Sequence, residues 1–410
     1  MYSLAIFLYS LAVRLVSPFN KKAGKMLAGQ KETFSILKKR LDPSVSYIWV
    51  HAASLGEFEQ GRPLMEKIRQ EKPEYKILLT FFSPSGYEVR KNYSGADIIC
   101  YLPFDHYWNA RKFLSLVKPE IAIFIKYEFW MNYLNRLKRL NIPIYIISAI
   151  FRHNQIFFRP YAYRYRKVLD NFKWFFVQDL QSSELLKKFN HTNVSIAGDT
   201  RFDRVYEIFE QRKDIPLVEK FLKHTEKKHT LVAGSTWIKD EDIIIPYINQ
   251  HPELKLIIAP HEINEQRIEA LKSRFTRPVV RFSQANENSI NDATCLIIDS
   301  IGLLSSIYRY GDFAYIGGGF GKGIHNIIEA AVYGIPVMFG PNYHKFREAK
   351  ELIACRGAMS ITGKDDFASY MNDFLAYPNL IDENGKSAKD YVADNLGATH
   401  KIYDHLFAVS

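Results

Sequence analysis

"YIWVHAASLGEFEQG", residues 47–61, changes from an apolar run to a segment with helical spacing within a few positions. The first half has the β-branched and aromatic composition of a buried strand. At the junction, Gly56 is suited to a sharp turn of the chain, and Ser54 is suited to capping a helix. The stretch therefore predicts a strand that leads directly into a helix, with the carboxylate of Glu57 at the junction.

The same alternation recurs along the chain in two series of short apolar runs. Each run is followed by a stretch with helical spacing, which is typical of parallel strands buried on both faces. The first series reads YIWVHAA, KILLTFF, DIICYLPF, EIAIFI, IPIYIISA, WFFVQ and VSIAGD. The second series reads HTLVAGST, LKLIIAPH, PVVRF, TCLIID, DFAYIGGGF and IPVMFGP. The pattern predicts an α/β protein with two doubly wound, Rossmann-like sheets, whose ligands bind beyond the carboxyl ends of the strands.

Length and composition also favour two domains. The chain has 410 residues, whereas single hydrophobic cores stop growing near ~250 residues. Hydrophobic residues make up 47% and charged residues 24%, which is a globular composition. No stretch is polar or repetitive enough to indicate disorder or a repeat array. Residues 205–228 are charged and carry no strand signal, so we place the domain boundary there, with the second domain starting at residue 206.

The N-terminal segment MYSLAIFLYSLAVRLVSPFNKKAGKML combines an apolar run with a basic end. Arg14 and Pro18 interrupt the run, which is shorter than the ~20 apolar residues of a spanning helix. A signal peptide would carry its basic residues before the apolar stretch rather than after it. We expect residues 1–20 to form a helix that lies in a membrane interface, and the net charge of +11 also favours an anionic partner. A helix packed on its own domain is the alternative.

The three cysteines are widely separated and form no zinc-binding spacing. Cys100, Cys295 and Cys355 all lie in or near apolar runs. We expect inert core thiols in a reducing compartment.

The segment AYIGGGFGKGIHNIIEAAVYGIPVMFGP, residues 314–341, carries the strongest functional signal. A glycine-rich loop that includes Gly318 and Gly319 follows an apolar run and precedes a helix expected to begin near His325. The backbone N–H groups of such a loop, with the positive end of a helix dipole, bind phosphate. The glycines fit neither the dinucleotide fingerprint nor the P-loop, which argues against those two classes of nucleotide site.

Asn326 and Glu329 fall in the first turn of that expected helix, next to the apolar Ile327 and Ile328. Asn326 would cap the turn. Glu329 would share a helical face with His325 and accept hydrogen bonds from ribose hydroxyls. A carboxylate that only stabilises the helix dipole is the alternative for Glu329.

Further loops follow other strands of the second series. They contain Ser235 in LVAGSTW, Pro260 and His261 in IIAPHEINEQR, and a turn at Ile301 and Gly302 in IIDSIGLLSSIY. One such loop alone is more often a helix cap than a ligand site. Together they would surround one crevice at the strand ends.

Two carboxylates and one guanidinium stand out in the first half. Glu57 follows the strand of the opening segment, Glu128 follows the run IFI, and Arg201 lies near the expected domain boundary. Glu128 taken alone could be a solvated loop acid. With Glu57 and Arg201, it is expected to face a cleft between the two domains.

These segments together resemble the Kdo transferases, glycosyltransferases that move 3-deoxy-D-manno-octulosonic acid (Kdo) from CMP-Kdo to the lipid A precursor. HAASLGEF is similar to the family's HAxSxGE segment, and YLPFD recurs unchanged. KYEFWMN resembles ExEΦWPN, where Φ is apolar, and GIHNIIEAAVYGIPVMFGP resembles GGHNΦΦEPA followed by a GxPVΦxGP segment. The resemblance covers nearly the whole chain.

The resemblance implies a GT-B architecture with the active site in the cleft. The acceptor-binding domain would span residues 21–205, the CMP-sugar-binding domain residues 206–395, and residues 396–410 would return to the first domain. Glu57 would be the proton acceptor of an inverting transfer, and Glu128 and Arg201 would support the transition state. Ser54 and Gly56 would lie on the acceptor side. The residues of the implied CMP site are Ser235, Pro260, His261, Ile301, Gly302, Leu303, Gly318, Gly319, His325, Asn326, Ile327, Ile328 and Glu329.

The resemblance also implies partners and a location. CMP-Kdo would be the donor and the lipid A precursor lipid IVA the acceptor, in lipopolysaccharide core biosynthesis. The protein would be monotopic on the cytoplasmic face of the bacterial inner membrane, bound to an anionic surface. It would need no metal or other cofactor and no nucleic acid.

The chain departs from the family pattern at several positions. The family usually reads PRHPER where this chain has PHEINEQR, so His261 replaces an arginine beside the nucleotide. Lys126, Met131, Ile324 and Ala330 are further replacements within the motifs. The alternatives are another GT-B nucleotide-sugar transferase, a sugar-nucleotide epimerase, and a catalytically silent scaffold on the membrane surface.

Overall fold

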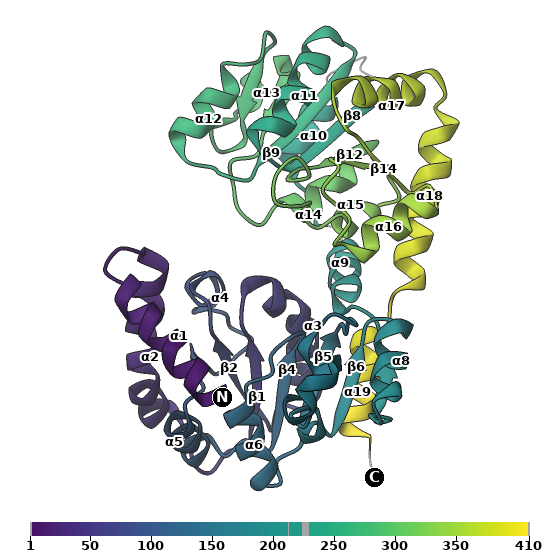
Figure 1. Cartoon of the computed structure of the whole chain (residues 1–410). Helices are drawn as coiled ribbons and strands as arrows, with labels where there is room; N and C mark the ends of the chain where they lie inside the picture. The colour runs from purple at the N-terminus through teal and green to yellow at the C-terminus, as the bar shows by residue number, and fades with distance from the viewer. Residues whose placement is uncertain (1, 212, 224–228, 409–410) are drawn as a thin grey trace. The chain divides into compact units, whose positions relative to one another are not determined.

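In the computed structural model the chain divides into two compact units (Figure 1). The structure describes residues 2–211, 213–223 and 229–408. One unit consists of Met1–Arg204 together with Leu396–Ser410, and the other of Val205–Asn395. The expected boundary segment 205–228 contains most of α9 (Thr200–Gln211) and α10 (Pro216–Lys223), while residues 212 and 224–228 lie outside the described part.

The first unit is built on a parallel sheet of seven strands in the order β3-β2-β1-β4-β5-β6-β7. All seven runs of the first series form strands, so the prediction for this half is confirmed. The strands are β1 (Tyr47–Ala52), β2 (Lys76–Phe81), β3 (Ile98–Tyr101), β4 (Ile121–Ile125), β5 (Ile144–Ala149), β6 (Trp174–Val177) and β7 (Val194–Ile196). The helices are α1 (Tyr2–Val16), α2 (Lys21–Arg40), α3 (Leu55–Glu71), α4 (Pro84–Arg90), α5 (Tyr107–Val117), α6 (Met131–Arg139), α7 (Tyr163–Arg166), α8 (Leu180–Lys188) and α19 (Ala398–Phe407).

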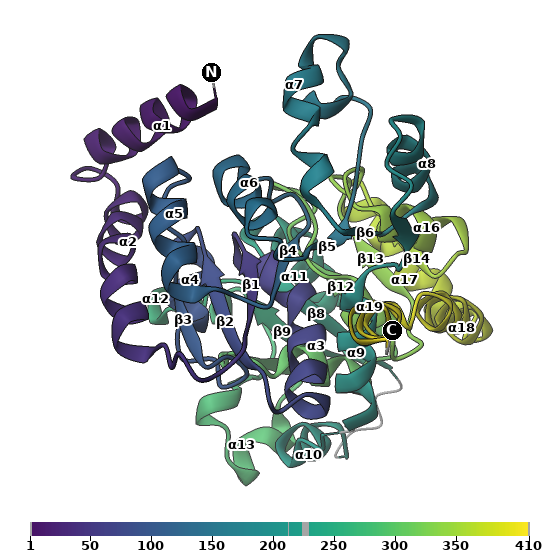
Figure 2. The same cartoon turned by 90° about the horizontal axis from the view of Figure 1, so that it is seen from below.

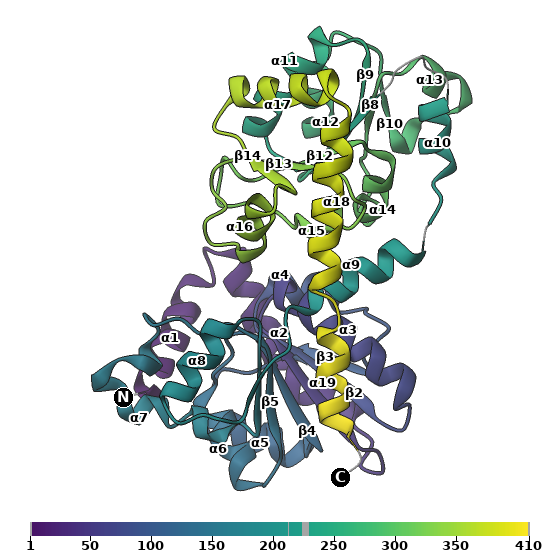
Figure 3. The ribbon, with the colours of Figure 1, turned by 90° about the vertical axis from the view of Figure 1, so that its right-hand side faces the viewer.

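Strand β1 shows why both faces of this sheet are covered. Its side chains alternate between two apolar clusters, with Trp49 in one and Val50 in the other. Helix α3 contributes Leu64 and Met65 to the cluster that contains Val50. Helix α19 contributes Ile402 to the same cluster and lies against α3 (Figure 3). The strand and the helix that flank Glu57 are therefore both fixed by buried contacts.

The second unit has a parallel sheet in the order β10-β11-β9-β8-β12-β13-β14. Its strands are β8 (His229–Thr236), β9 (Leu254–Pro260), β10 (Val279–Arg281), β11 (Cys295–Ile297), β12 (Phe313–Ile316), β13 (Val337–Phe339) and β14 (Ala358–Ser360). Its other helices are α11 (Ile238–Gln250), α12 (Glu265–Lys272), α13 (Glu287–Asp292), α14 (Leu304–Ile307), α15 (Ile328–Ala331), α16 (Arg347–Ala354), α17 (Lys364–Ala376) and α18 (Asn379–Asp394). The sequence pattern missed β14, because this edge strand is short and only its first residue is buried.

Each sheet has a switch point, where the order of strands reverses. In the first unit it lies between β1 and β4, and in the second between β8 and β12. Open parallel sheets bind ligands at such points, beyond the carboxyl ends of the strands. Glu57 and Glu128 follow β1 and β4, and the loop with Gly318 follows β12. Ser235 lies within the last residues of β8, not in a loop after the strand as the sequence suggested.

The chain bends by 117° between the N-terminal helices α1 and α2, which form an elbow beside α5 (Figure 2). Within the described residues no single helix has the length and apolar character needed to cross a membrane, although this bent pair passes by length and composition together. Helix α1 exposes a set of large apolar side chains, namely Leu4, Phe7, Leu8, Tyr9, Leu11, Leu15 and Val16. The Tyr2 hydroxyl nevertheless donates to Asp105 Oδ2 at 2.6 Å, so the helix also contacts its own unit.

The expectation of three core thiols was wrong for one cysteine. Cys100 and Cys295 are buried in strands, but Cys355 is exposed. Cys355 is the residue that follows the last turn of α16, where the chain turns toward β14. The apolar run before it belongs to the helix, and the helix ends before the cysteine can enter the core.

Candidate active site

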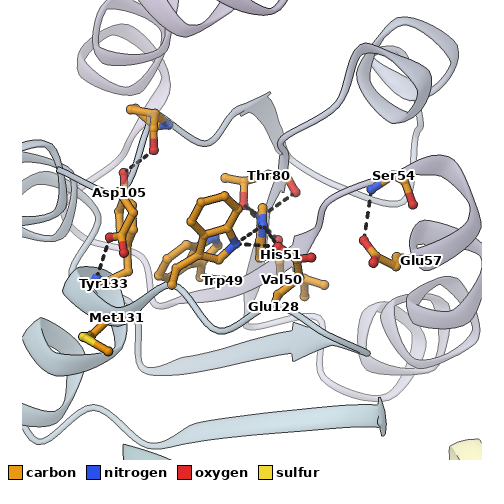
Figure 4. A network of polar contacts seen from close by, with 12 residues as sticks. Trp49, Val50, His51, Ser54, Glu57, Thr80, Asp105, Glu128, Met131 and Tyr133 are labelled. Atoms are coloured by element: carbon orange, nitrogen blue, oxygen red, sulfur yellow. Dashed lines mark hydrogen bonds and ion pairs between the residues drawn. The ribbon is translucent and has the colours of Figure 1, made fainter. Parts of the chain in front are cut away.

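The carboxyl end of β1 carries a buried histidine that joins several polar groups (Figure 4). His51 is fully buried, and its Nδ1 lies 2.8 Å from the hydroxyl of Thr80. Its Nε2 lies 3.2 Å from Glu128 Oε2 and 3.1 Å from the indole nitrogen of Trp130. The indole N–H also donates to Glu128 Oε2 at 2.5 Å. Glu128 is thus held by two rings, which contradicts the alternative of a solvated loop acid.

Glu57 lies in the first turn of α3, three residues after Ser54, the position that caps the helix. Its carboxylate accepts a hydrogen bond from the backbone N–H of Ser54 at 3.1 Å. Burial first, and then the charge of Glu128, raise the pKa of Glu57 from 4.5 to about 7. Backbone N–H groups and Lys126 oppose this rise but do not cancel it. A carboxylate with such a pKa can exchange a proton at neutral pH.

The expected role of Gly56 was wrong. The residue lies inside α3, and its φ is not in the left-handed region. A Cβ at this position would meet nothing within 4 Å. The turn between strand and helix is made by Ala53 and Ser54 instead, because the helix already begins at Leu55. Gly56 leaves an open space beside Glu57.

Arg201 lies in the first turn of α9, where Asp199 holds it. Its Nε and Nη2 donate to Asp199 Oδ2 at 2.9 and 2.7 Å. Burial would raise the pKa of Asp199, but Arg201 and then Lys126 hold it below its ordinary value. Because Lys126 acts on both Glu57 and Asp199, it links the two acidic groups electrostatically. Arg201 therefore enters the site as part of an ion pair.

A pocket of about 390 Å³ opens beside Glu128. Its walls are mostly aromatic and include the start of α1. The lining residues are Tyr2, Ile6, Tyr127, Glu128, Phe129, Trp130, Gln155, Phe157 and Tyr165. A volume of this size suits part of an organic substrate.

In the second unit, the loop after β12 packs tightly against its neighbours. Gly318 has a φ of +94°, and its N–H donates to Asp240 Oδ2 at 3.0 Å. A Cβ on Gly319 would lie 2.6 Å from the backbone of Gly340. Gly317 N–H, likewise, donates to Gly234 O at 2.9 Å. These two N–H groups serve the fold, so they are not the phosphate donors that the sequence suggested.

The helix after this loop also differs from the prediction. Helix α15 is only four residues long and begins at Ile328 rather than near His325. Asn326 does not cap it; the Asn326 Nδ2 donates to Glu329 Oε1 at 2.9 Å. His325 precedes the helix, so it cannot share a helical face with Glu329. The residues from Lys322 to Asn326 remain irregular because Gly318 and Gly323 close a turn by a backbone hydrogen bond.

Glu329 joins two loops of the second unit. Besides its bond from Asn326, its Oε2 accepts a hydrogen bond from the hydroxyl of Ser305 at 2.7 Å. Ser305 lies in α14, which follows the turn with Ile301, Gly302 and Leu303. In that turn Ile301 is 90% exposed and Gly302 has a φ of +89°. The carboxylate thus connects the predicted site residues after β11 with those after β12.

Three rings gather at the ends of β8 and β9. His261 stacks on Trp237 and on His325, with ring centroids 4.5 and 4.6 Å apart. The Trp237 indole N–H donates to His325 Nε2 at 3.3 Å. Ser235 precedes this cluster at a bulge of β8, with a φ of +54°, and Pro260 ends β9.

Sequence reasoning did not single out His51, Trp130, Trp237 or Ser305. His51 and Trp130 lie within the quoted segments HAASLGEF and KYEFWMN. Their position near a predicted strand end is the feature of the sequence that could have identified them as site residues. Trp237 follows Ser235 and Thr236 in the same way. Among the described residues, no group of three or more His, Cys, Asp or Glu side chains could hold a metal ion.

Comparisons with known proteins give similar sequences over most of the chain. Residues 28–204 match the family model of 3-deoxy-D-manno-octulosonic-acid transferase (kdotransferase). The chain is 27% identical to the 3-deoxy-D-manno-octulosonic acid transferase of Aquifex aeolicus, covering 85% of this chain and 92% of the relative. It is 28% identical to the enzyme of that name from Rickettsia bellii, covering 89% and 87%.

Solved structures show the fold alone. UDP-GlcNAc 2-epimerase from Neisseria meningitidis superposes with a TM-score of 0.63 at 14% identity, covering 88% of this chain and all of that one. MurG from Acinetobacter baumannii superposes with a TM-score of 0.57 at 12% identity, covering 89% and 100%. The two parallel sheets and these likenesses are those of a GT-B fold. From this match over residues 28–204 and from these relatives, the chain is a glycosyltransferase similar to the 3-deoxy-D-manno-octulosonic acid transferases.

Proposed function

We propose that this protein transfers Kdo from CMP-Kdo to lipid IVA, the lipid A precursor, with inversion at the anomeric carbon. Similarity to the 3-deoxy-D-manno-octulosonic acid transferases supports Kdo transfer in lipopolysaccharide biosynthesis. The observation that carries the mechanism is the carboxylate of Glu57, which follows a switch-point strand and has a pKa of about 7. A base with a pKa near the working pH is the most effective kind.

The proposed reaction is a single displacement. A hydroxyl oxygen of the acceptor attacks the anomeric carbon of Kdo, and the bond from that carbon to the CMP phosphate breaks. Glu57 takes the hydroxyl proton, and CMP leaves with the bonding electrons. Glu128 raises the proton affinity of Glu57 by its charge, and the Arg201 and Asp199 pair lies in the same electrostatic neighbourhood through Lys126.

The aromatic pocket beside Glu128 supports a lipid acceptor. Most of its lining side chains are apolar or aromatic, and two of them belong to α1. The second unit then supplies the CMP site. The Glu329 carboxylate accepts hydrogen bonds from the ribose hydroxyls, and the loops after β8, β9 and β12 surround the nucleotide. His261 replaces an arginine of the family pattern, and its ring is held in place by stacking on Trp237 and His325.

One assay tests this function. Purified protein is mixed with lipid IVA and with CMP-Kdo generated in situ, and the products are read by mass spectrometry. We expect Kdo-bearing lipid, at a rate that rises with pH through about 7 because Glu57 must be ionised. Binding of UDP in preference to CMP, with no product, would favour another GT-B enzyme. Neither product nor nucleotide binding would favour the scaffold.

We further propose a monotopic protein on the cytoplasmic face of the inner membrane. The apolar side chains that α1 exposes, and the lysines at the start of α2, support this location. Deleting residues 1–20 should move the protein toward the soluble fraction, because it removes the apolar side chains that would be buried in the interface. The lysines that remain contribute only ~1 kcal/mol each near an anionic surface. A truncated protein that stays with membranes in high salt would contradict the proposal.

A further inference from the structure

A second pocket lies in the elbow between α1 and α2, away from Glu57. Its volume is about 580 Å³, within the range of small-molecule sites. The segment between β3 and α5 closes it. The lining residues are Arg14, Ser17, Leu27, Gln30, Lys31, Phe34, Pro103, Phe104, His106 and Asn109.

The charged side chains that line this elbow pocket are all basic. Arg14 and Lys31 line it, and none of the ten described lining residues carries a carboxylate. Burial, and then the charge of Arg14, lower the pKa of His106, which disfavours a positive charge on this ring. His106 Nε2 lies 3.1 Å from Ser10 Oγ, which ties the pocket wall to α1. The pocket thus offers two cations over a partly apolar floor.

A buried donor lies in the same wall. Gln30 is 8% exposed, and its Oε1 accepts a hydrogen bond from the backbone N–H of Phe104 at 3.2 Å. Its Nε2 has no hydrogen-bond partner within the described chain. A buried donor without a partner is unfavourable. An oxygen-rich group that entered the pocket and reached this amide would satisfy it.

The position of the pocket limits its occupant. It opens beside α1, whose large apolar side chains are exposed. Of its wall residues, Arg14 lies in the last turn of that helix and Ser17 directly follows the helix. A molecule bound there would have a phosphate near Arg14 and Lys31 and apolar groups along Leu27, Phe34 and Phe104. A membrane phospholipid combines these two chemistries in one molecule.

We propose that the elbow pocket binds the head group of one anionic phospholipid, with its phosphate between Arg14 and Lys31. This site is separate from the pocket beside Glu128. It adds to the proposed membrane association a saturable contact with one lipid molecule, beyond attraction to a charged surface. The two can be separated, because a monomeric lipid has no surface potential.

The probe is dihexanoyl phosphatidylglycerol below its micelle concentration, titrated by calorimetry into the full chain. We expect one site, which the double variant Arg14→Gln/Lys31→Gln weakens roughly tenfold or more by removing two charged hydrogen bonds. The control is Lys21→Gln/Lys22→Gln, which removes the same charge from residues that do not line the pocket. That control should bind within about twofold of the wild type.

A second variant guards against misfolding. Ser17→Trp fills the pocket without changing the net charge, and it should also lose the site while far-UV circular dichroism stays unchanged. Equal losses in both double variants, or no saturable binding by the wild type, would overturn the proposal. So would equal binding of zwitterionic dihexanoyl phosphatidylcholine.

Two competitors distinguish the other occupants. Millimolar inorganic phosphate that displaces the lipid completely would mean a free-phosphate site. Displacement by the phosphorylated disaccharide of the acceptor, without its acyl chains, would assign the pocket to the acceptor. Either result would refute a phospholipid site, and because the readout is binding, neither depends on Kdo transfer.

Discussion

The switch points of the two sheets differ in the groups that form them: ionisable side chains in the first unit and closely packed backbone in the second. At the ends of β1 and β4, ionisable side chains converge: Glu57 and Glu128 share an electrostatic field, and His51 bonds to Glu128. At the ends of β8 and β12, the backbone dominates, with Gly318 in a left-handed conformation and Gly319 against Gly340. The first edge, at β1 and β4, therefore has groups that can exchange a proton. The second edge, at β8 and β12, instead constrains the shape of a group that binds there.

The largest expected effect lies at the first edge. Glu57→Gln should keep the fold and CMP binding but lower turnover roughly 10²-fold or more, since an amide cannot accept the proton. Single-turnover rates with saturating donor and acceptor measure this. Chemistry at nearly the wild-type rate would make Glu57 a helix-capping carboxylate and break the contrast between the two edges.

Glu59→Gln is the matched control for this variant. Glu59 lies on the same helix, but its carboxylate pairs with Arg90 at 2.7 Å and with Arg62. Both pairs are half-buried and still reach solvent, so they contribute ~1 kcal/mol to stability. We expect turnover close to that of the wild type.

The second edge should respond to shape rather than charge. Gly319→Ala places a methyl group 2.6 Å from the Gly340 backbone, so we expect a loss of stability of about 3 kcal/mol or of CMP binding. Gly363→Ala is the control, because a Cβ there meets nothing within 4 Å. Thermal unfolding and nucleotide titration compare the two variants. Equal behaviour would mean that the loop after β12 adapts and does not depend on close backbone contact.

The same contrast explains what could be predicted from the sequence. Strands buried on both faces have an unmistakable composition, and all runs in both series formed strands. β14 escaped because only Ala358 of its three residues is buried. The position of Glu57 followed from the strand-to-helix junction, whereas the role of Gly56 did not, because glycine composition alone cannot tell a turn from a helix with open space beside it.

The glycine-rich loop shows the limit more sharply. Gly317 to Gly323 suggested free N–H donors, but tertiary partners such as Asp240 occupy some of them. Asp240 is 78 residues away in sequence from Gly318, and no local pattern could have paired the two. The short α15 has the same cause, since the loop closes on itself before helical geometry begins at Ile328.

Glu329 is a charged side chain at the second edge that we expect to contribute to nucleotide binding. Glu329→Ala should weaken CMP binding by ~1–3 kcal/mol if its carboxylate accepts hydrogen bonds from ribose. Ser305→Ala separates this role from that of a loop joint, because it removes only the 2.7 Å bond to Oε2. Calorimetric titration of CMP should show a much smaller loss for Ser305→Ala. Equal losses would mean that Glu329 only joins the loops.

The smallest effect is a pH dependence of stability, and it tests the first edge without any substrate. The folded pKa of Glu57, about 7, lies above its ordinary value of 4.5, so the folded state holds the proton more tightly than the unfolded chain does. Below 4.5 both states are protonated and Glu57 contributes nothing. Between 4.5 and 7 the unfolded chain releases the proton first, so stability falls as pH rises, and the loss is complete above 7.

The shift corresponds to about 3 kcal/mol, and partial contact with solvent screens some of it, so we expect about 1–2 kcal/mol. Urea unfolding at pH 5 to 8 measures this as the difference between the wild type and Glu57→Gln, in which other titrations cancel. The wild type should lose stability relative to the variant as pH rises. Glu128→Gln should reduce that loss, because it removes the like charge. A difference that stays constant would mean that the N–H groups of α3 keep Glu57 ionised throughout, and that the first edge holds a fixed charge instead of a base poised near neutrality.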